Sequence, residues 1–157
     1  MARPRKEMVN DNSSKVDQCV RCFADGFNCS QALVSTYGPQ FGLDTGQALR
    51  ISSPFGAGMG RMSETCGAVT GAFMVIGLKA GRVKVDDKDA QERTYRLVNE
   101  FVGKFKERNG SILCRELIGY DLSKPEEMKH AREEGAFRTK CPKFVRDSAQ
   151  ILESLVL

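Results

Sequence analysis

The sequence predicts a single all-α domain, and two patterns point to this fold class. Apolar residues recur at helical spacing through almost the whole chain, whereas the alternation typical of strands is nearly absent. Glycine, proline and capping residues divide the pattern into segments joined by short connections. We therefore expect a single-domain helical bundle of about six to seven helices, with a central apolar helix near residues 64–80.

Short helices are predicted before the central one, and each begins at a side chain suited to capping: Ser13 or Ser14, Asn28, and Asp44 or Thr45. They end near Gly26, at Gly38–Pro39 and after Ile51. Residues 54–61 follow, with glycine at every second position from 56 to 60. This spacing favours an irregular loop.

The central helix is expected to start at Ser63 or Thr65 and to stop at Ala80–Gly81. Asp86 or Asp87 then caps the longest helix, which Asn109–Gly110 ends. The remaining predicted starts are Ser111, which caps a helix over 112–118, Ser123 with Glu126 as a capping box around Pro125, and Cys141–Pro142, where the last helix begins.

Composition and charge limit the class of protein. The chain has 157 residues, 41% hydrophobic and 28% charged, with a net charge of +4, values typical of one globular domain. We expect a disordered basic tail over residues 1–12, which lacks the apolar run of a secretory signal, and a single domain over 13–157. The apolar stretch 66–78 is shorter than the roughly 20 residues of a membrane span. A cytoplasmic protein without membrane association is therefore expected.

Nucleic-acid binding is not supported, because basic residues are mixed with acidic ones along each predicted helix. The only histidine, His130, lies in a charged helix and is expected to be solvated. Neither a Cys–His catalytic pair nor a histidine-rich metal site is therefore predicted.

Six cysteines are present, and in a reducing cytosol they favour metal binding or redox chemistry over structural disulfides. Four of them, Cys29, Cys66, Cys114 and Cys141, fall at predicted helix N-termini. Free backbone N–H groups and the helix dipole stabilise an anion there and can lower a thiol pKa by roughly 1 to 5 units. A thiolate is both the nucleophile of disulfide exchange and a ligand for zinc or iron.

The spacing of these four does not match a paired zinc ribbon, so a shared site would have to be assembled by folding. Cys19 and Cys22 form a C-x-x-C inside a predicted helix with no preceding strand, unlike a thioredoxin motif. Residue 23 is phenylalanine rather than histidine, which excludes covalent haem attachment of that type. Core packing and an auxiliary redox or metal pair both remain open for these two cysteines.

Five stretches together resemble a known family: Gly26–Ala32, the glycine loop 55–61, Cys66–Ala72, Cys114–Gly119 and the late Cys141. This is the family of redox-active proteins named for the cysteine pattern C_GCAxxG_C_C, and the resemblance covers roughly residues 15–156. It implies a redox role for Cys29, Cys66, Cys114 and Cys141, and none for Cys19 and Cys22. The pattern is also similar to the non-haem part of split-Soret cytochromes, but no haem is expected here.

Glycines near the cysteines are candidate cofactor-binding positions. Gly58 and Gly60 lack the Lys-Ser/Thr of a phosphate loop. With Gly67, they are expected to let the backbone approach the sulfur of Cys66 and offer N–H groups to thiolates or a bound cluster. Arg61 is expected to be exposed or to supply positive charge nearby. The small residues of the central helix suit close helix packing, and a homodimer seam stays open.

Three functions compete at this point. The first is an electron-transfer protein whose four cysteines converge on a metal or an iron–sulfur cluster and exchange electrons with a redox partner protein. The second is a thiol–disulfide oxidoreductase that uses two of the same cysteines. The third is a non-catalytic, zinc-stabilised scaffold or dimerising module.

Overall fold

The structure is a computed structural model that describes residues 12–157, and it confirms the all-α prediction. The tail predicted over residues 1–12 lies outside this range except for Asn12. The right-handed helices are more numerous than the six to seven expected. They are α1 (Lys15–Ala24), α2 (Cys29–Tyr37), α3 (Thr45–Ser52), α5 (Gly67–Ala80), α6 (Lys88–Asn109), α7 (Cys114–Ile118), α8 (Pro125–Glu133) and α9 (Ala136–Val156).

Short turns complete the chain: 3-10 turns at Gly38–Phe41 and Ser53–Phe55, and the single turn α4 (Gly56–Met59). Across residues 12–157 the one β pairing is an isolated antiparallel bridge between Thr65 and Leu113.

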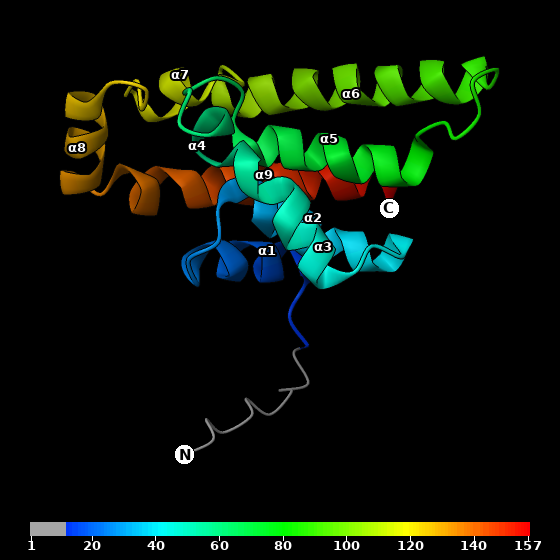
Figure 1. The fold of residues 1–157 in the computed structure, drawn as a ribbon, viewed down its shortest axis with the longest axis horizontal. Helices are drawn as coiled ribbons and strands as arrows, with labels where there is room; N and C mark the ends of the chain where they lie inside the picture. Colours follow the sequence, from blue (N-terminus) through cyan, green and yellow to red (C-terminus); the bar gives the residue numbers. More distant parts are fainter. Residues whose placement is uncertain (1–11) are drawn as a thin grey trace.

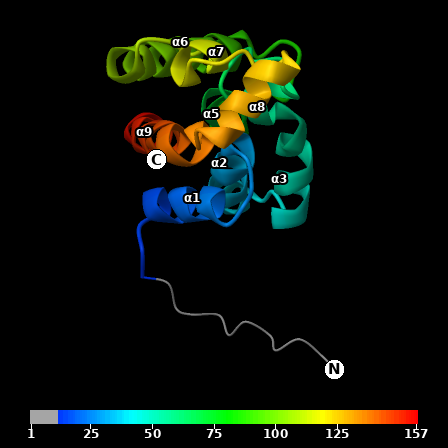
Figure 2. The same cartoon turned by 90° about the vertical axis from the view of Figure 1, so that its left-hand side faces the viewer.

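The helices are arranged in layers. Figures 1 and 2 show α6 on one side, α5 and α9 in the middle, and α1, α2 and α3 on the other side. The helix α8 crosses one end of the molecule between α7 and α9, facing the viewer in Figure 2. The turn α4 and α7 lie toward this same end, which therefore gathers segments from both halves of the sequence.

The predicted central helix is α5, and nine of its residues from Gly67 to Ala80 are buried. Gly67 and Gly71 press against α2: a Cβ on Gly71 would lie 3.0 Å from the carbonyl oxygen of Ser30. The small-residue face of α5 is thus used for packing inside the molecule, and it leaves no free surface there for a dimer seam.

Four of the predicted helix caps are confirmed. Ser14, Asn28, Asp44 and Asp87 each accept a hydrogen bond from a backbone N–H of the first turn. Asn28 and Gln31 form a reciprocal capping box at the start of α2. The beginning of α2 is therefore fixed by two hydrogen bonds.

The start predicted for the last helix is wrong. The helix α9 begins at Ala136, after Gly135 with φ of 67° has ended the preceding turn, so Pro142 lies inside it. Burial of Ala136 and packing of Phe137 against the core extend the helix past a proline that removes one backbone N–H. Cys141 is thus an interior residue of α9.

Three other predicted starts also shift. The hydroxyl of Ser123 donates to Asp121 instead of capping α8, which begins at Pro125. Ser111 accepts a hydrogen bond from the Leu113 amide, and α7 starts only at Cys114. The central helix starts at Gly67, because residues 64–66 pair with the segment that precedes α7. Within the part of the chain that the structure describes, no helix is long and apolar enough to cross a bilayer.

Candidate functional site: a pocket lined by four cysteines

The four predicted cysteines line one cavity of about 480 Å³. Cys29, Cys66, Cys114 and Cys141 are each at most 9% exposed, and all four are free thiols. They come from α2, the residue before α5, α7 and α9, so folding brings together positions that are distant in sequence. The cavity lies at the end of the molecule that α8 crosses, because Met128 and Arg132 of α8 also line it.

Close packing of α2 on α5 brings Cys29 next to Cys66. Cys29 is the first residue of α2, and Cys66 is the N-cap of α5. A Cβ on Gly67 would lie 3.1 Å from the Ser30 nitrogen and 3.3 Å from the Cys29 Cβ. Glycine is thus required at position 67 for the start of α5 to approach the start of α2 this closely. The same contact brings the Cys66 side chain near that of Cys29.

The bridge between Thr65 and Leu113 sets Cys66 beside Cys114. The Cys66 amide donates to the Ile112 carbonyl at 2.8 Å, and the Cys114 amide donates to the Glu64 carbonyl at 2.6 Å. These hydrogen bonds fix the backbone on both sides of the bridge. They also mean that the Cys114 amide is already used and is not free to hold a thiolate.

Cys141 reaches the cavity from within α9 and not from a helix N-terminus, which corrects the sequence-based interpretation. Its thiol is near enough to Cys29 to raise the pKa of the Cys29 thiol. The buried hydroxyl of Ser148 donates to the Ala68 carbonyl at 2.6 Å and ties α9 to the first turn of α5. Docking of α9 therefore completes the cysteine set.

The predicted irregular loop contains a left-handed helical turn. Ala57, Gly58, Met59, Gly60 and Arg61 all have φ between 56° and 68°. The Gly60 amide donates to the Gly56 carbonyl at 2.9 Å, as one turn of helix requires. An L-residue in this conformation costs roughly 1–2 kcal/mol, so the turn must be held by the rest of the fold.

Two features hold this turn. A Cβ on Gly58 would lie 2.6 Å from the Glu64 nitrogen, so the backbone folds back tightly on itself. The fully buried Ser63, with φ of 61°, donates its hydroxyl to the Tyr120 carbonyl and accepts from the Leu122 amide. Because Ala57 and Gly58 line the cavity, the strained segment forms part of its wall.

The thiols are less acidic than helix N-termini alone would make them. Contact with Cys141, together with burial, raises the pKa of Cys29, and contact with Cys29, together with burial, raises that of Cys66. The amides of Ala68 and Val69 oppose the shift at Cys66. Burial raises the pKa of Cys114 to about 12, with the nearby Ser63 hydroxyl acting in the opposite direction. Burial and contact between thiols therefore outweigh the helix dipole in setting the pKa of these cysteines.

Cys19 and Cys22 lie outside the cavity. Cys19 is fully buried in the core, and burial raises the pKa of its thiol to about 12. Cys22 is half-buried, with its sulfur 3.6 Å from the Ser35 hydroxyl. Their surroundings favour the packing interpretation over an auxiliary pair.

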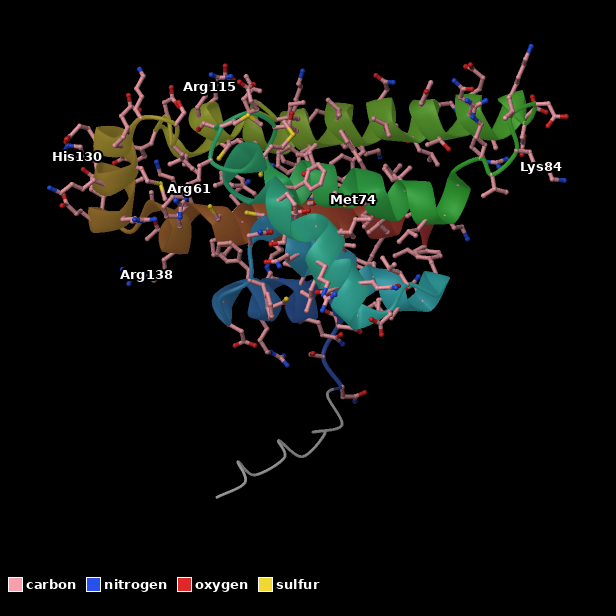
Figure 3. All side chains as sticks on the ribbon, in the orientation of Figure 1. Arg61, Met74, Lys84, Arg115, His130 and Arg138 are labelled. Atoms are coloured by element: carbon pink, nitrogen blue, oxygen red, sulfur yellow. The ribbon has the colours of Figure 1, made fainter. Side chains whose placement is uncertain are left out.

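Some of the other predicted site residues line the cavity, and others lie outside it. Gly58 and Gly67 line the cavity, whereas Gly60 is exposed and borders a neighbouring shallow pocket. Arg61 is exposed and lines both, and in Figure 3 it lies near the end where α4 and α8 are found. His130 is exposed on α8, as predicted. Three residues of this region were not predicted as site residues: Ser63, which was expected only as a helix start, and Arg132 and Arg138, which resemble ordinary surface residues.

The cysteines are not arranged around a single point. Within residues 12–157, no three side chains of His, Cys, Asp or Glu are placed to hold one metal ion. A tetrahedral zinc site would therefore need these side chains to move.

Residues 27–155 match the family described as "putative redox-active protein (C_GCAxxG_C_C)". The chain belongs to this family. The match spans all four cavity cysteines and excludes Cys19 and Cys22, in agreement with their separation in the structure. No curated protein and no solved structure matches the chain.

Proposed function

We propose that this C_GCAxxG_C_C protein is an electron-transfer protein in which Cys29, Cys66, Cys114 and Cys141 hold an iron–sulfur cluster. The observation that carries the proposal is the convergence of these four buried, unpaired thiols on one cavity. All-sulfur ligation is typical of iron–sulfur clusters and of zinc.

The donor set suits a polynuclear centre. Iron–sulfur clusters are commonly held by four cysteine thiolates, which is the number of cysteines that line this cavity. A cavity of about 480 Å³ has room for a group larger than one ion.

When bound, such a cluster supplies a one-electron redox couple. The chain's own residues would hold it and tune it. The four thiols would bind as thiolates, and the amides of Ala68 and Val69, which favour the charged form of Cys66, would stabilise its negative charge. Phe144 and Ile118 form apolar walls that exclude water. Electrons would pass to a redox partner protein at the cavity mouth.

Anaerobic purification followed by iron, labile-sulfide and absorption measurements tests the proposal. The wild type should contain iron and sulfide and show charge-transfer bands, and Cys66→Ser should lose most of both. Cys22→Ser is the matched control, because Cys22 lies outside the cavity, and it should keep the wild-type content. A colourless protein after anaerobic cluster reconstitution, or stoichiometric redox-silent zinc, would overturn the proposal.

One observation favours a second candidate, a thiol–disulfide oxidoreductase. Both Cys66 and Cys141 are near enough to Cys29 to alter the pKa of its thiol, so each is a neighbouring thiol with which Cys29 could form a disulfide. The two thiols would form one S–S bond and pass two electrons and two protons to an organic disulfide, which leaves as two thiols. Peptide mapping after treatment with oxidised glutathione should then find Cys29 linked to one of these partners. Recovery of only unlinked cavity cysteines would exclude this reaction.

A further inference from the structure

The cavity wall beyond the cysteines carries charge of one sign. Arg61, Arg132 and Arg138 line it, from the left-handed turn, α8 and α9 respectively, and no Asp, Glu, Lys or His side chain is among its lining residues. All three arginines are exposed, so they lie at the rim, whereas the cysteines are buried. Figure 3 shows Arg61 and Arg138 toward the same end of the molecule, with Lys84 at the opposite end.

No carboxylate in the described part of the chain pairs with these arginines. Acidic residues close to them in sequence have other partners: Glu64 pairs with Arg115 at 2.8 Å, Glu133 with Lys129 at 4.0 Å, and Glu134 accepts a hydrogen bond from Tyr120. Three guanidinium groups around one opening are therefore available to an external anion.

Below the rim the wall is apolar and aromatic. Phe23, Phe27, Phe137 and Phe144 line the cavity together with Met128. Phe27 is 42% exposed, a high value for a large aromatic side chain, and it borders the opening. A cavity of about 480 Å³ lies within the range of pockets that bind small organic molecules.

We propose that this cavity binds an amphipathic organic anion, with a carboxylate or phosphate group on the three arginines and a flat apolar body against the phenylalanines. The rim supplies bidentate donors that match such head groups, and the aromatic walls supply the apolar contact. The ligand would lie directly above the four cysteines. The proposal goes beyond the redox function, because the binding site consists of residues that need no metal centre to form it.

A pair of fluorescent probes tests the proposal. 8-Anilinonaphthalene-1-sulfonate carries an anionic group on a flat apolar body, and N-phenyl-1-naphthylamine has the same body without the charge. Both are titrated into the protein as isolated, with its metal content recorded. The anionic probe should bind at a ratio of one to one and more tightly than the neutral probe, and added salt should weaken it. 1-Naphthoate and 1-naphthyl phosphate should compete with it, and the tighter competitor identifies the preferred head group.

Variants locate the site. Arg132→Gln and Arg138→Gln should each raise the Kd of the anionic probe by roughly tenfold, since each removes a charged hydrogen-bonding group. The Kd of the neutral probe should change less than about twofold. Arg50→Gln is the matched control, because Arg50 is exposed on α3 away from the cavity.

The outcomes are separable from those of the redox proposal. Anion binding retained in Cys66→Ser supports this inference even if no cluster is found. Absence of saturable binding, equal weakening in Arg50→Gln, or equal loss of the neutral probe in the rim variants would overturn it.

Discussion

Gly67 lies so close to Cys29 that a Cβ added to the glycine would be 3.3 Å from the Cβ of the cysteine. This contact joins the start of α5 to the start of α2, and Cys66 precedes Gly67 in the chain. The distance between two of the cavity sulfurs thus depends on a residue that has no side chain.

We therefore predict that Gly67→Ala destabilises the protein by about 1–3 kcal/mol, the usual cost of overpacking. The new Cβ would also meet the Phe55 carbonyl at 3.0 Å. Gly77→Ala is the control in the same helix, where a Cβ meets nothing within 4 Å, and it should stabilise by up to about 1 kcal/mol. Urea unfolding measures both, and equal effects of the two substitutions would contradict the packing argument.

The left-handed turn predicts an unusual response to glycine. Ala57 has φ of 56° and ψ of 41°, a conformation that glycine adopts without strain. Ala57→Gly should leave the free energy of unfolding unchanged or raise it by up to about 1 kcal/mol. Ala90→Gly, in the right-handed helix α6, should instead lower it by about 1 kcal/mol. If thermal unfolding finds that both substitutions cost the same, the turn is not strained at position 57.

Two buried serines should respond in opposite directions to alanine. Ser30 is fully buried, and its hydroxyl has no hydrogen-bond partner among the described residues. Ser30→Ala should therefore stabilise the protein by about 1 kcal/mol or more. The hydroxyl of Ser148 is equally buried but bonded to the Ala68 carbonyl, and Ser148→Ala should cost about 1 kcal/mol. A loss of stability in Ser30→Ala comparable to that in Ser148→Ala would show that Ser30 has a partner.

Stability should fall in alkali because of Cys19. Burial raises the pKa of this thiol from 9.0 to about 12 in the folded state. Below pH 9 both states keep the proton, and stability does not depend on it. Between about pH 9 and 12 the unfolded chain loses the proton while the folded chain keeps it, so unfolding becomes easier by about 1.4 kcal/mol per pH unit.

Urea unfolding at several pH values checks this, with Cys19→Ala as the comparison. The alanine variant should be less stable at pH 7 because it leaves a cavity, but its stability should fall less steeply above pH 9. Parallel slopes for the two proteins would assign the alkaline loss to other groups.

The success of the sequence-based predictions depends on the range of the interactions involved. Ser14, Asn28, Asp44 and Asp87 were predicted as caps because a cap bonds to its own first turn. The four cavity cysteines were found through the family resemblance and their places near helix starts. For Cys141 the second reason was wrong, because packing of Ala136 and Phe137 extends α9 past Pro142.

Features that depend on distant contacts had no local signal. The left-handed turn is held in part by the Ser63 hydroxyl, whose partners at 120 and 122 lie far along the chain. Likewise, Arg132 and Arg138 become rim residues only when α8 crosses the end of the bundle. The rise in thiol pKa also follows from burial and mutual contact, which residue spacing cannot reveal.

Docking of α9 has a consequence for how the cysteine set is taken apart. Cys141 lies within this helix, which the Ser148 hydroxyl ties to the Ala68 carbonyl. Local unfolding of α9 alone would therefore carry one sulfur away and leave the other three in place. The four thiols share a cavity only while this helix is docked.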